Sequence, residues 1–261
     1  MAESFLRVET GGGVARLTLA RPDKHNAFDD ALIAELTAAL EAAGGDKAVR
    51  VVVLAGEGKS FSAGADLGWM KRMAAYGDAE NLADARALAN LMRVLNDLPK
   101  PTVARVQGAA YGGGVGLVAC CDIAIAASSA KFCLSEAKLG LIPSVISPYV
   151  VAAMGSRAAR RYFLTSEVFD AEEAHRLGLV HRIDWTDRID HDLDEIVAAL
   201  LANGPMAMAE SKDLIRRVAA GPVDDAMVED TAQRIARIRA SAEGAEGVAA
   251  FLERRAPSWR R

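Results

Sequence analysis

Three short segments combine residue types that could polarise a carbonyl group and move a proton. Phe61–Leu67 is a turn of small residues, Gly108–Gly114 ends in consecutive glycines, and Leu134–Glu136 ends in a carboxylate. Glycines let backbone N–H groups approach a ligand closely, and the start of a helix adds positive potential. Two N–H groups aimed at one carbonyl oxygen would form an oxyanion hole, in which each donor typically contributes about 3 kcal/mol to transition-state stabilisation. Glu136 could then transfer a proton beside that carbonyl without a metal ion.

Motifs for other chemistries are incomplete. Gly56–Ser60 resembles the end of a phosphate-binding loop, but the first glycine of that motif would fall at Val53, inside a predicted strand. Gly114–Ala119 fits the G-x-G-x-x-A pattern of dinucleotide-binding proteins, but the next predicted strand does not end in the acidic residue that binds ribose. The sequence has no G-x-S-x-G motif, and its four histidines lack metal-ligand spacing. We therefore expect neither NAD nor a metal to bind.

An alternation of strands and helices must position the three segments. Strand-like apolar runs are found at residues 5–10, 14–20, 50–55, 102–106 and 122–126. The first helical stripe, which follows the capping candidates Asp29 and Asp30, consists of Leu32, Leu36 and Leu40. A second stripe consists of Leu82, Ala85, Ala89, Met92 and Leu95. Repeated strand pairs followed by a crossover helix favour an α/β fold with a parallel sheet.

The last part of the chain is predicted to be helical. From about Asp190 onward the strand signal disappears, and four apolar helical faces are separated by Gly204-Pro205 and Gly221-Pro222. We therefore divide the chain into a core that holds the catalytic segments, residues 1–190, and a C-terminal helical region, residues 191–261. The helical region is small for a second catalytic domain, so we expect it to pack on the core or on a neighbouring subunit.

Composition limits the partners and the compartment. The 261 residues are 51% hydrophobic and carry a net charge of −4, with no basic stripe for a nucleic acid. Three cysteines without a disulfide framework indicate reduced, intracellular thiols. Met1–Ser4 do not begin a targeting signal, and no apolar run approaches the ~20 residues that span a bilayer. We expect a cytoplasmic protein that binds neither membranes nor nucleic acids.

Together, the segments resemble the enoyl-CoA hydratase/isomerase (crotonase) family. The resemblance extends from Arg21-Pro22 and Asn26-Ala27 to Phe251–Arg255, which is nearly the whole chain. It implies an α/β spiral of repeated ββα units, followed by C-terminal helices that build a trimer, often paired into a hexamer. It also implies an acyl-CoA thioester as the substrate. No separate cofactor is expected, because CoA is part of that substrate.

The resemblance implies roles for individual residues. The two oxyanion donors fall on the backbone N–H groups of Ala65 and Gly113, and the acid/base falls on Glu136. The segment that binds the CoA thioester falls on Ala63, Ala65, Asp66 and Leu67. The turn of Lys24 and His25 is expected near the adenine or the phosphates of CoA.

One departure from the family concerns the second carboxylate. Two-carboxylate hydratases of this family carry a glutamate three residues beyond the oxyanion glycine, and this chain has Gly116 there. Glu136 would then serve both proton transfers, or another group would help. Glu80 and Asp84 are candidates, although residues of this kind are usually solvated. We expect Gly116 to leave room beside the reacting atoms, so that a glutamate placed there would either raise hydration or clash with a substrate carboxylate.

At finer grain, three stretches resemble bacterial methylglutaconyl-CoA or carboxygeranoyl-CoA hydratases, which act in leucine and acyclic-terpenoid breakdown. These stretches are residues 63–73, 113–122 and 140–149. Hydration of a branched or carboxylated enoyl-CoA, such as 3-methylglutaconyl-CoA, is therefore the first hypothesis. Enoyl-CoA isomerisation is the second, because moving a proton between two carbons needs a single carboxylate. A catalytically degenerate binding or scaffold protein is the third.

Overall fold

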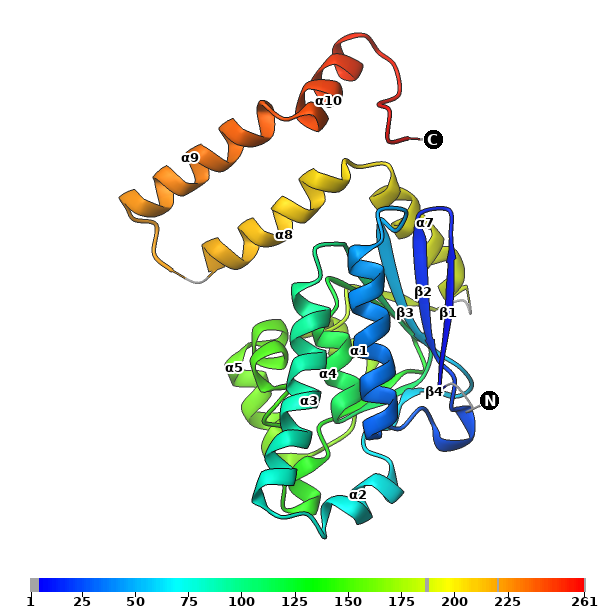
Figure 1. Cartoon of the computed structure of the whole chain (residues 1–261). Helices are drawn as coiled ribbons and strands as arrows, with labels where there is room; N and C mark the ends of the chain where they lie inside the picture. Colours follow the sequence, from blue (N-terminus) through cyan, green and yellow to red (C-terminus); the bar gives the residue numbers. More distant parts are fainter. Residues whose placement is uncertain (1–4, 186–187, 220, 261) are drawn as a thin grey trace.

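Two sheets form the centre of the computed structural model, which describes residues 5–185, 188–219 and 221–260 (Figure 1). Met1–Ser4, which entered the prediction on targeting, lie outside this range. The larger sheet has the strand order β1-β2-β3-β5-β7-β10. Its strands are β1 (Leu6–Gly11), β2 (Val14–Leu19), β3 (Val51–Gly56), β5 (Thr102–Val106), β7 (Ile123–Ala127) and β10 (Arg182–Asp184). β1 is antiparallel to β2, and the following neighbours pair in parallel.

The smaller sheet consists of short strands that follow those of the larger sheet along the chain. They are β4 (Ser60–Ser62), β6 (Ala109–Tyr111), β8 (Lys131–Cys133) and β9 (Phe169–Asp170). β4, β6 and β8 pair in parallel, and β9 is antiparallel to β8. The chain thus places β3, β5 and β7 in one sheet and β4, β6 and β8 in the other. This alternation produces successive ββα units.

Helices cover the sheets and complete the core. They are α1 (Asp30–Gly45), α2 (Leu67–Met73), α3 (Asp78–Asp97), α4 (Gly113–Cys120), α5 (Ser147–Thr165), α6 (Ala171–Arg176) and α7 (Ile189–Leu201). Short 3-10 turns span Pro22–Lys24 and Glu136–Leu139. α1 begins as predicted, because Asp29 accepts a hydrogen bond from the N–H of Leu32 (2.9 Å). Leu36 and Leu40 on the same face are fully buried, which stabilises the fold by about 2 kcal/mol each.

The predicted stripe on α3 is only half correct. Leu91, Met92 and Leu95 are buried, whereas Leu82 is 50% exposed in the first half of the helix. In that half, Ala85 and Leu88 border a cavity instead of the core, and Ala89 is exposed like Leu82.

The C-terminal helices fall into two groups. α7 packs through Ile189 and Leu193 on the face of the large sheet opposite to α1 and α3, so the expected boundary at residue 190 lies inside this helix. α8 (Pro205–Ala219), α9 (Asp225–Arg239) and α10 (Ala242–Leu252) extend from the core as an arm (Figure 1). The Nζ of Lys212 holds α8 to Asp122 (2.6 Å). In the described part of the chain, no helix has the length and apolarity to cross a membrane.

Candidate active site

The carboxyl ends of β4, β6 and β8 bring the three predicted segments together. β4 leads into Ala63–Asp66, β6 into Gly112–Gly113, and β8 into Ser135–Glu136. Parallel neighbouring strands present these ends at one edge of the sheet, where open α/β sheets bind their ligands. A methyl group added to Gly112 would lie 3.2 Å from Oε1 of Glu136 and 3.9 Å from Cα of Gly64. The two glycine turns and the carboxylate are therefore in direct proximity.

A cavity of about 490 Å³ opens at this edge. Five predicted site residues contribute to its lining, namely Ala63, Ala65, Leu67, Gly113 and Glu136. The apolar wall is formed by Phe28, Trp69, Met70, Met73, Ala85, Leu88, Leu139, Leu141 and Val145. Polar groups on the cavity wall also include Asn81 and Asp84 from α3. A largely apolar cavity with a few convergent polar groups is typical of a small-molecule site.

Two backbone N–H groups at the cavity have the properties of an oxyanion hole. Within the described residues, neither the N–H of Ala65 nor that of Gly113 donates to a protein acceptor. Phe28 fixes the first turn, because its N–H donates to the carbonyl of Gly64 (2.6 Å) and its carbonyl accepts from Asp66 (2.7 Å). Gly64 adopts a φ of +89°, which other residues rarely tolerate.

Glu136 is suited to hold a proton beside the two turns. Its side chain is half-buried, and its Oε2 atom is buried without a hydrogen-bond partner in the described part of the structure. Burial raises the pKa of this carboxyl group. A carboxyl group with a raised pKa can donate and recover a proton near neutral pH, as an acid/base catalyst must.

The remaining predicted residues flank the cavity instead of lining it. Asp66 is buried, and its carboxylate caps α2 by accepting from the N–H of Trp69 (3.0 Å). Burial would raise the pKa of Asp66, but hydrogen bonds from Trp69 and Lys24 outweigh it and lower the pKa. Lys24 forms an ion pair with Asp66 (3.4 Å), and Nδ1 of His25 contacts Oγ of Ser60 (3.1 Å). The carbonyl of His25 also accepts from Ala63 (2.9 Å), so this turn supports the oxyanion segment.

Arg21 has a structural role that sequence reasoning did not identify. Its buried guanidinium group forms ion pairs with Asp29 (2.7 Å) and Asp66 (3.4 Å), which cap α1 and α2 respectively. It also donates to the carbonyl of Ala27 (3.1 Å). One side chain thereby ties two helix starts to the turn that carries Ala65. The Arg-Pro motif drew attention to Arg21, but the sequence did not indicate that Asp29 and Asp66 are its partners.

The expectation that Gly116 leaves free space is wrong. A Cβ atom at this position would lie 2.2 Å from Cγ2 of Ile146 and 3.3 Å from Cε of Met92. The side chain of Ile146, just before α5, therefore fills the place of the missing glutamate. Gly114 is equally confined, because its Cβ would lie 2.6 Å from the carbonyl oxygen of Ser62. These glycines of the apparent nucleotide motif serve close helix packing.

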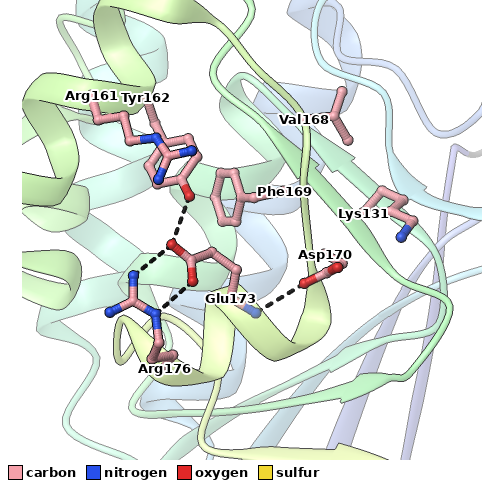
Figure 2. A pocket seen from close by; sticks show the side chains of 8 residues that line it. All are labelled: Lys131, Arg161, Tyr162, Val168, Phe169, Asp170, Glu173 and Arg176. Carbon is pink, nitrogen blue, oxygen red and sulfur yellow. Dashed lines mark hydrogen bonds and ion pairs between the residues drawn. The ribbon is translucent and has the colours of Figure 1, made fainter.

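A second depression, of about 440 Å³, is lined by side chains that include the ion pair of Glu173 with Arg176 (Figure 2). The carboxylate of Glu173 accepts from the hydroxyl of Tyr162 (2.8 Å) and from Nε and Nη2 of Arg176 (2.6 and 2.7 Å). The hydrogen bonds from Arg176 and then Tyr162 lower the pKa of Glu173 to about 2. A carboxylate so firmly ionised anchors α6 against α5 and is a poor proton donor.

The described residues contain one group of possible metal ligands, which sequence spacing did not reveal. His191, Asp192 and Glu195 place ligand atoms within 4.8 Å of one another on α7. Arg182 occupies this site, since its Nη2 and Nη1 atoms contact Asp192 (2.6 Å) and Glu195 (2.7 Å). A cation would have to displace the guanidinium group.

Comparison with known proteins establishes the family. The model of the enoyl-CoA hydratase/isomerase family matches residues 9–261. The crystal structure of an enoyl-CoA hydratase from Shewanella pealeana superposes with a TM-score of 0.96 at 50% identity, covering 98% of this chain and 96% of that one. Crotonyl-CoA hydratase of Syntrophomonas wolfei is 32% identical over 98% of this chain and 97% of its own. 1,2-Epoxyphenylacetyl-CoA isomerase of Escherichia coli is 33% identical over 98% of both.

The chain belongs to the enoyl-CoA hydratase/isomerase family, and its expected α/β crotonase fold is confirmed. It is an enzyme of acyl-CoA thioesters, since both the family and these relatives are enzymatic.

Proposed function

We propose that this enzyme adds water to the double bond of a 2-enoyl-CoA thioester. The observation that carries the proposal is the meeting of the free N–H groups of Ala65 and Gly113 with Glu136 in one cavity. A thioester oxygen between the two N–H groups would gain negative charge as water attacks Cβ. Glu136 would then donate its proton to Cα, where the electrons of the double bond collect, and the proton that the water loses would pass to a carboxylate at the cavity and restore the acid. This chemistry needs no cofactor besides the CoA of the substrate.

Isomerisation is the second candidate, and Gly116 favours it. Two-carboxylate hydratases place a glutamate there, but Ile146 fills that space in this chain. With Glu136 as the sole acid/base, a proton could leave one carbon of the acyl chain and return to another. The relatives include both a hydratase and an isomerase of acyl-CoA thioesters, so hydration and double-bond migration must be separated by assay.

We infer that the acyl group is branched, following the resemblance to methylglutaconyl-CoA and carboxygeranoyl-CoA hydratases. Met70, Met73 and Leu88 support this inference, because methionine side chains adapt to irregular apolar shapes. A carboxylate on the acyl chain, as in 3-methylglutaconyl-CoA, would be repelled by an ionised Asp84 if it lay beside that residue in the cavity. A carboxylated substrate would therefore direct its charge toward the mouth.

A panel of thioesters tests the reaction and the substrate together. It should contain straight, branched and carboxylated 2-enoyl-CoAs, and 3-enoyl-CoAs for double-bond migration. We expect hydration of a branched 2-enoyl-CoA to have the highest kcat/KM. Migration without hydration on every substrate would establish the isomerase instead, and no turnover would favour a binding or scaffold protein.

We further propose that the arm assembles the enzyme into a trimer or a dimer of trimers. Apolar side chains on α8, α9 and α10 remain exposed in the single chain, including Ile215 (64%), Val228 (57%) and Phe251 (82%). Faces of this size usually become buried against another protein surface. In a trimer, the apolar faces of α8, α9 and α10 would become buried against the same faces of neighbouring subunits.

A further inference from the structure

Asp84 places a second carboxylate in the candidate active site. It lies on α3 and lines the cavity to which Glu136 also contributes. Its Oδ1 atom accepts a hydrogen bond from Nε1 of Trp69 (3.2 Å). Trp69 is itself buried in the cavity wall, and its backbone N–H donates a hydrogen bond to the carboxylate of Asp66. Asp84 is therefore positioned by the same α2 segment that continues from the oxyanion turn.

The other acidic candidate on this helix has a different environment. Glu80 is exposed, and its Oε2 accepts from the N–H of Gly77 (2.9 Å) at the start of α3. It does not contribute to the cavity. Of the two candidate carboxylates, Asp84 is therefore the one that lines the cavity.

Asp84 and Glu136 differ in the groups that contact their carboxylates. Burial raises the pKa of both carboxyl groups. At Asp84 the hydrogen bond from Trp69 opposes this rise, and among the charges nearby Asp30 raises the pKa while Arg72 lowers it. At Glu136 a hydrogen bond from its own backbone opposes the rise, and the buried Oε2 has no donor in the described structure. Burial favours the protonated form of both groups, while the hydrogen bond from Trp69 favours the ionised form of Asp84, which is the form that a base needs.

We propose that Asp84 is the second catalytic carboxylate of the hydration reaction, binding the attacking water and accepting its proton. The water oxygen forms a bond to Cβ, and the π electrons of the Cα=Cβ bond move toward Cα and the thioester oxygen. Glu136 then donates its proton to Cα. The reaction leaves Asp84 protonated and Glu136 ionised, and exchange with solvent restores both. Asp84 on α3 thereby takes the role of the family's second glutamate, which is absent from α4 because Gly116 stands at its position. This proposal rests on the proposed hydratase function.

Asp84→Asn tests the proposal, with Glu80→Gln as the matched control on the same helix. Hydration is measured on the best 2-enoyl-CoA, and a second assay follows α-proton exchange of the saturated acyl-CoA in D₂O. Exchange needs the oxyanion hole and Glu136 but no attacking water. We expect Asp84→Asn to lower hydration by about 10²-fold or more while exchange stays within a few-fold of wild type. Glu80→Gln should leave both rates unchanged.

Two outcomes would overturn the assignment. Wild-type hydration by Asp84→Asn would exclude it directly, and an equal loss of hydration and exchange would show that Asp84 only shapes the cavity. Absence of hydration in the wild type, with exchange intact, would instead refute the hydratase function itself. The failure of the two proposals is thus distinguishable.

Trp69→Phe provides an independent test should Asp84→Asn not fold. This substitution removes the N–H group that donates to the Asp84 carboxylate and leaves Asp84 itself in place. The pKa of Asp84 should then rise, and the acidic limb of kcat/KM for hydration should move to higher pH. An acidic limb that stays in place would contradict the proposal.

Discussion

Gly116→Ala is expected to destabilise the protein, although alanine is normally the better helix former. Replacing a glycine inside a helix by alanine ordinarily adds about 0.5–1 kcal/mol to stability. Here the new methyl group would lie 2.2 Å from Cγ2 of Ile146, far inside van der Waals contact. Overpacking of this kind costs about 1–3 kcal/mol. We therefore expect the free energy of unfolding to fall by about 1–2 kcal/mol.

A double-mutant cycle with Ile146→Ala isolates the contact. Removing Cγ2 of Ile146 leaves its Cβ, which would lie 2.9 Å from the new methyl group. The penalty of Gly116→Ala should therefore shrink by about 1 kcal/mol in that background, as coupled neighbours do. Urea unfolding followed by circular dichroism measures all four proteins. Additive effects, or a Gly116→Ala variant more stable than wild type, would refute the reasoning. Gly116→Glu should be worse still, because it also buries a carboxylate.

Four further predictions concern catalysis, stability and assembly. Glu136→Gln should lower kcat by about 10²–10⁴-fold with little change in KM, and a fully active variant in steady-state assays would remove this residue from the mechanism. Arg21→Met should lower the free energy of unfolding by about 3 kcal/mol, because the buried Asp66 and the half-buried Asp29 both lose the guanidinium group that pairs with them; a loss under about 1 kcal/mol in urea unfolding would contradict this. Since the pKa of Glu173 is about 2 in the folded state, below its ordinary 4.5, its stabilisation is complete above pH 4.5 and lost as pH falls toward 2. The stability difference between wild type and Glu173→Gln should shrink between about pH 6 and about pH 3, and a constant difference would argue against the ion pair. Sedimentation should show a trimer or hexamer that Phe251→Asp weakens, and a stable wild-type monomer at micromolar concentration would exclude the assembly.

The sequence allowed the large sheet and the site segments to be predicted, but not the small sheet as a unit. Apolar runs such as 51–56 carry a clear strand signal, because both faces are buried. β4 and β6 have three residues each, too few for a period to show. Their parallel pairing, which brings the catalytic segments together, depends on contacts between residues about fifty positions apart.

The side chain that fills the space beside Gly116 could not be predicted from the sequence either. Ile146 approaches Gly116 from a turn thirty residues later in the chain, and only the packed structure joins them. Asp84 was recognised as a candidate among ordinary helix carboxylates. Choosing Asp84 over Glu80 required knowing which face of α3 lines the cavity. Local periodicity predicted that face only in part, because residues in the first half of the helix border the cavity and not the core.

The first helix of the arm depends on a residue that is synthesised well after it. The N–H groups of Met206 and Ala207 at the start of α8 donate to the carboxylate of Glu243 in α10 (2.9 and 2.8 Å). At the usual ribosomal rate, the 37 residues that follow Met206 up to and including Glu243 take roughly 2–7 s to add. During that interval the N–H groups of Met206 and Ala207 must donate their hydrogen bonds to water instead. The start of α8 therefore gains its carboxylate cap only once α10 has been made, and a chain that stops before α10 lacks that cap.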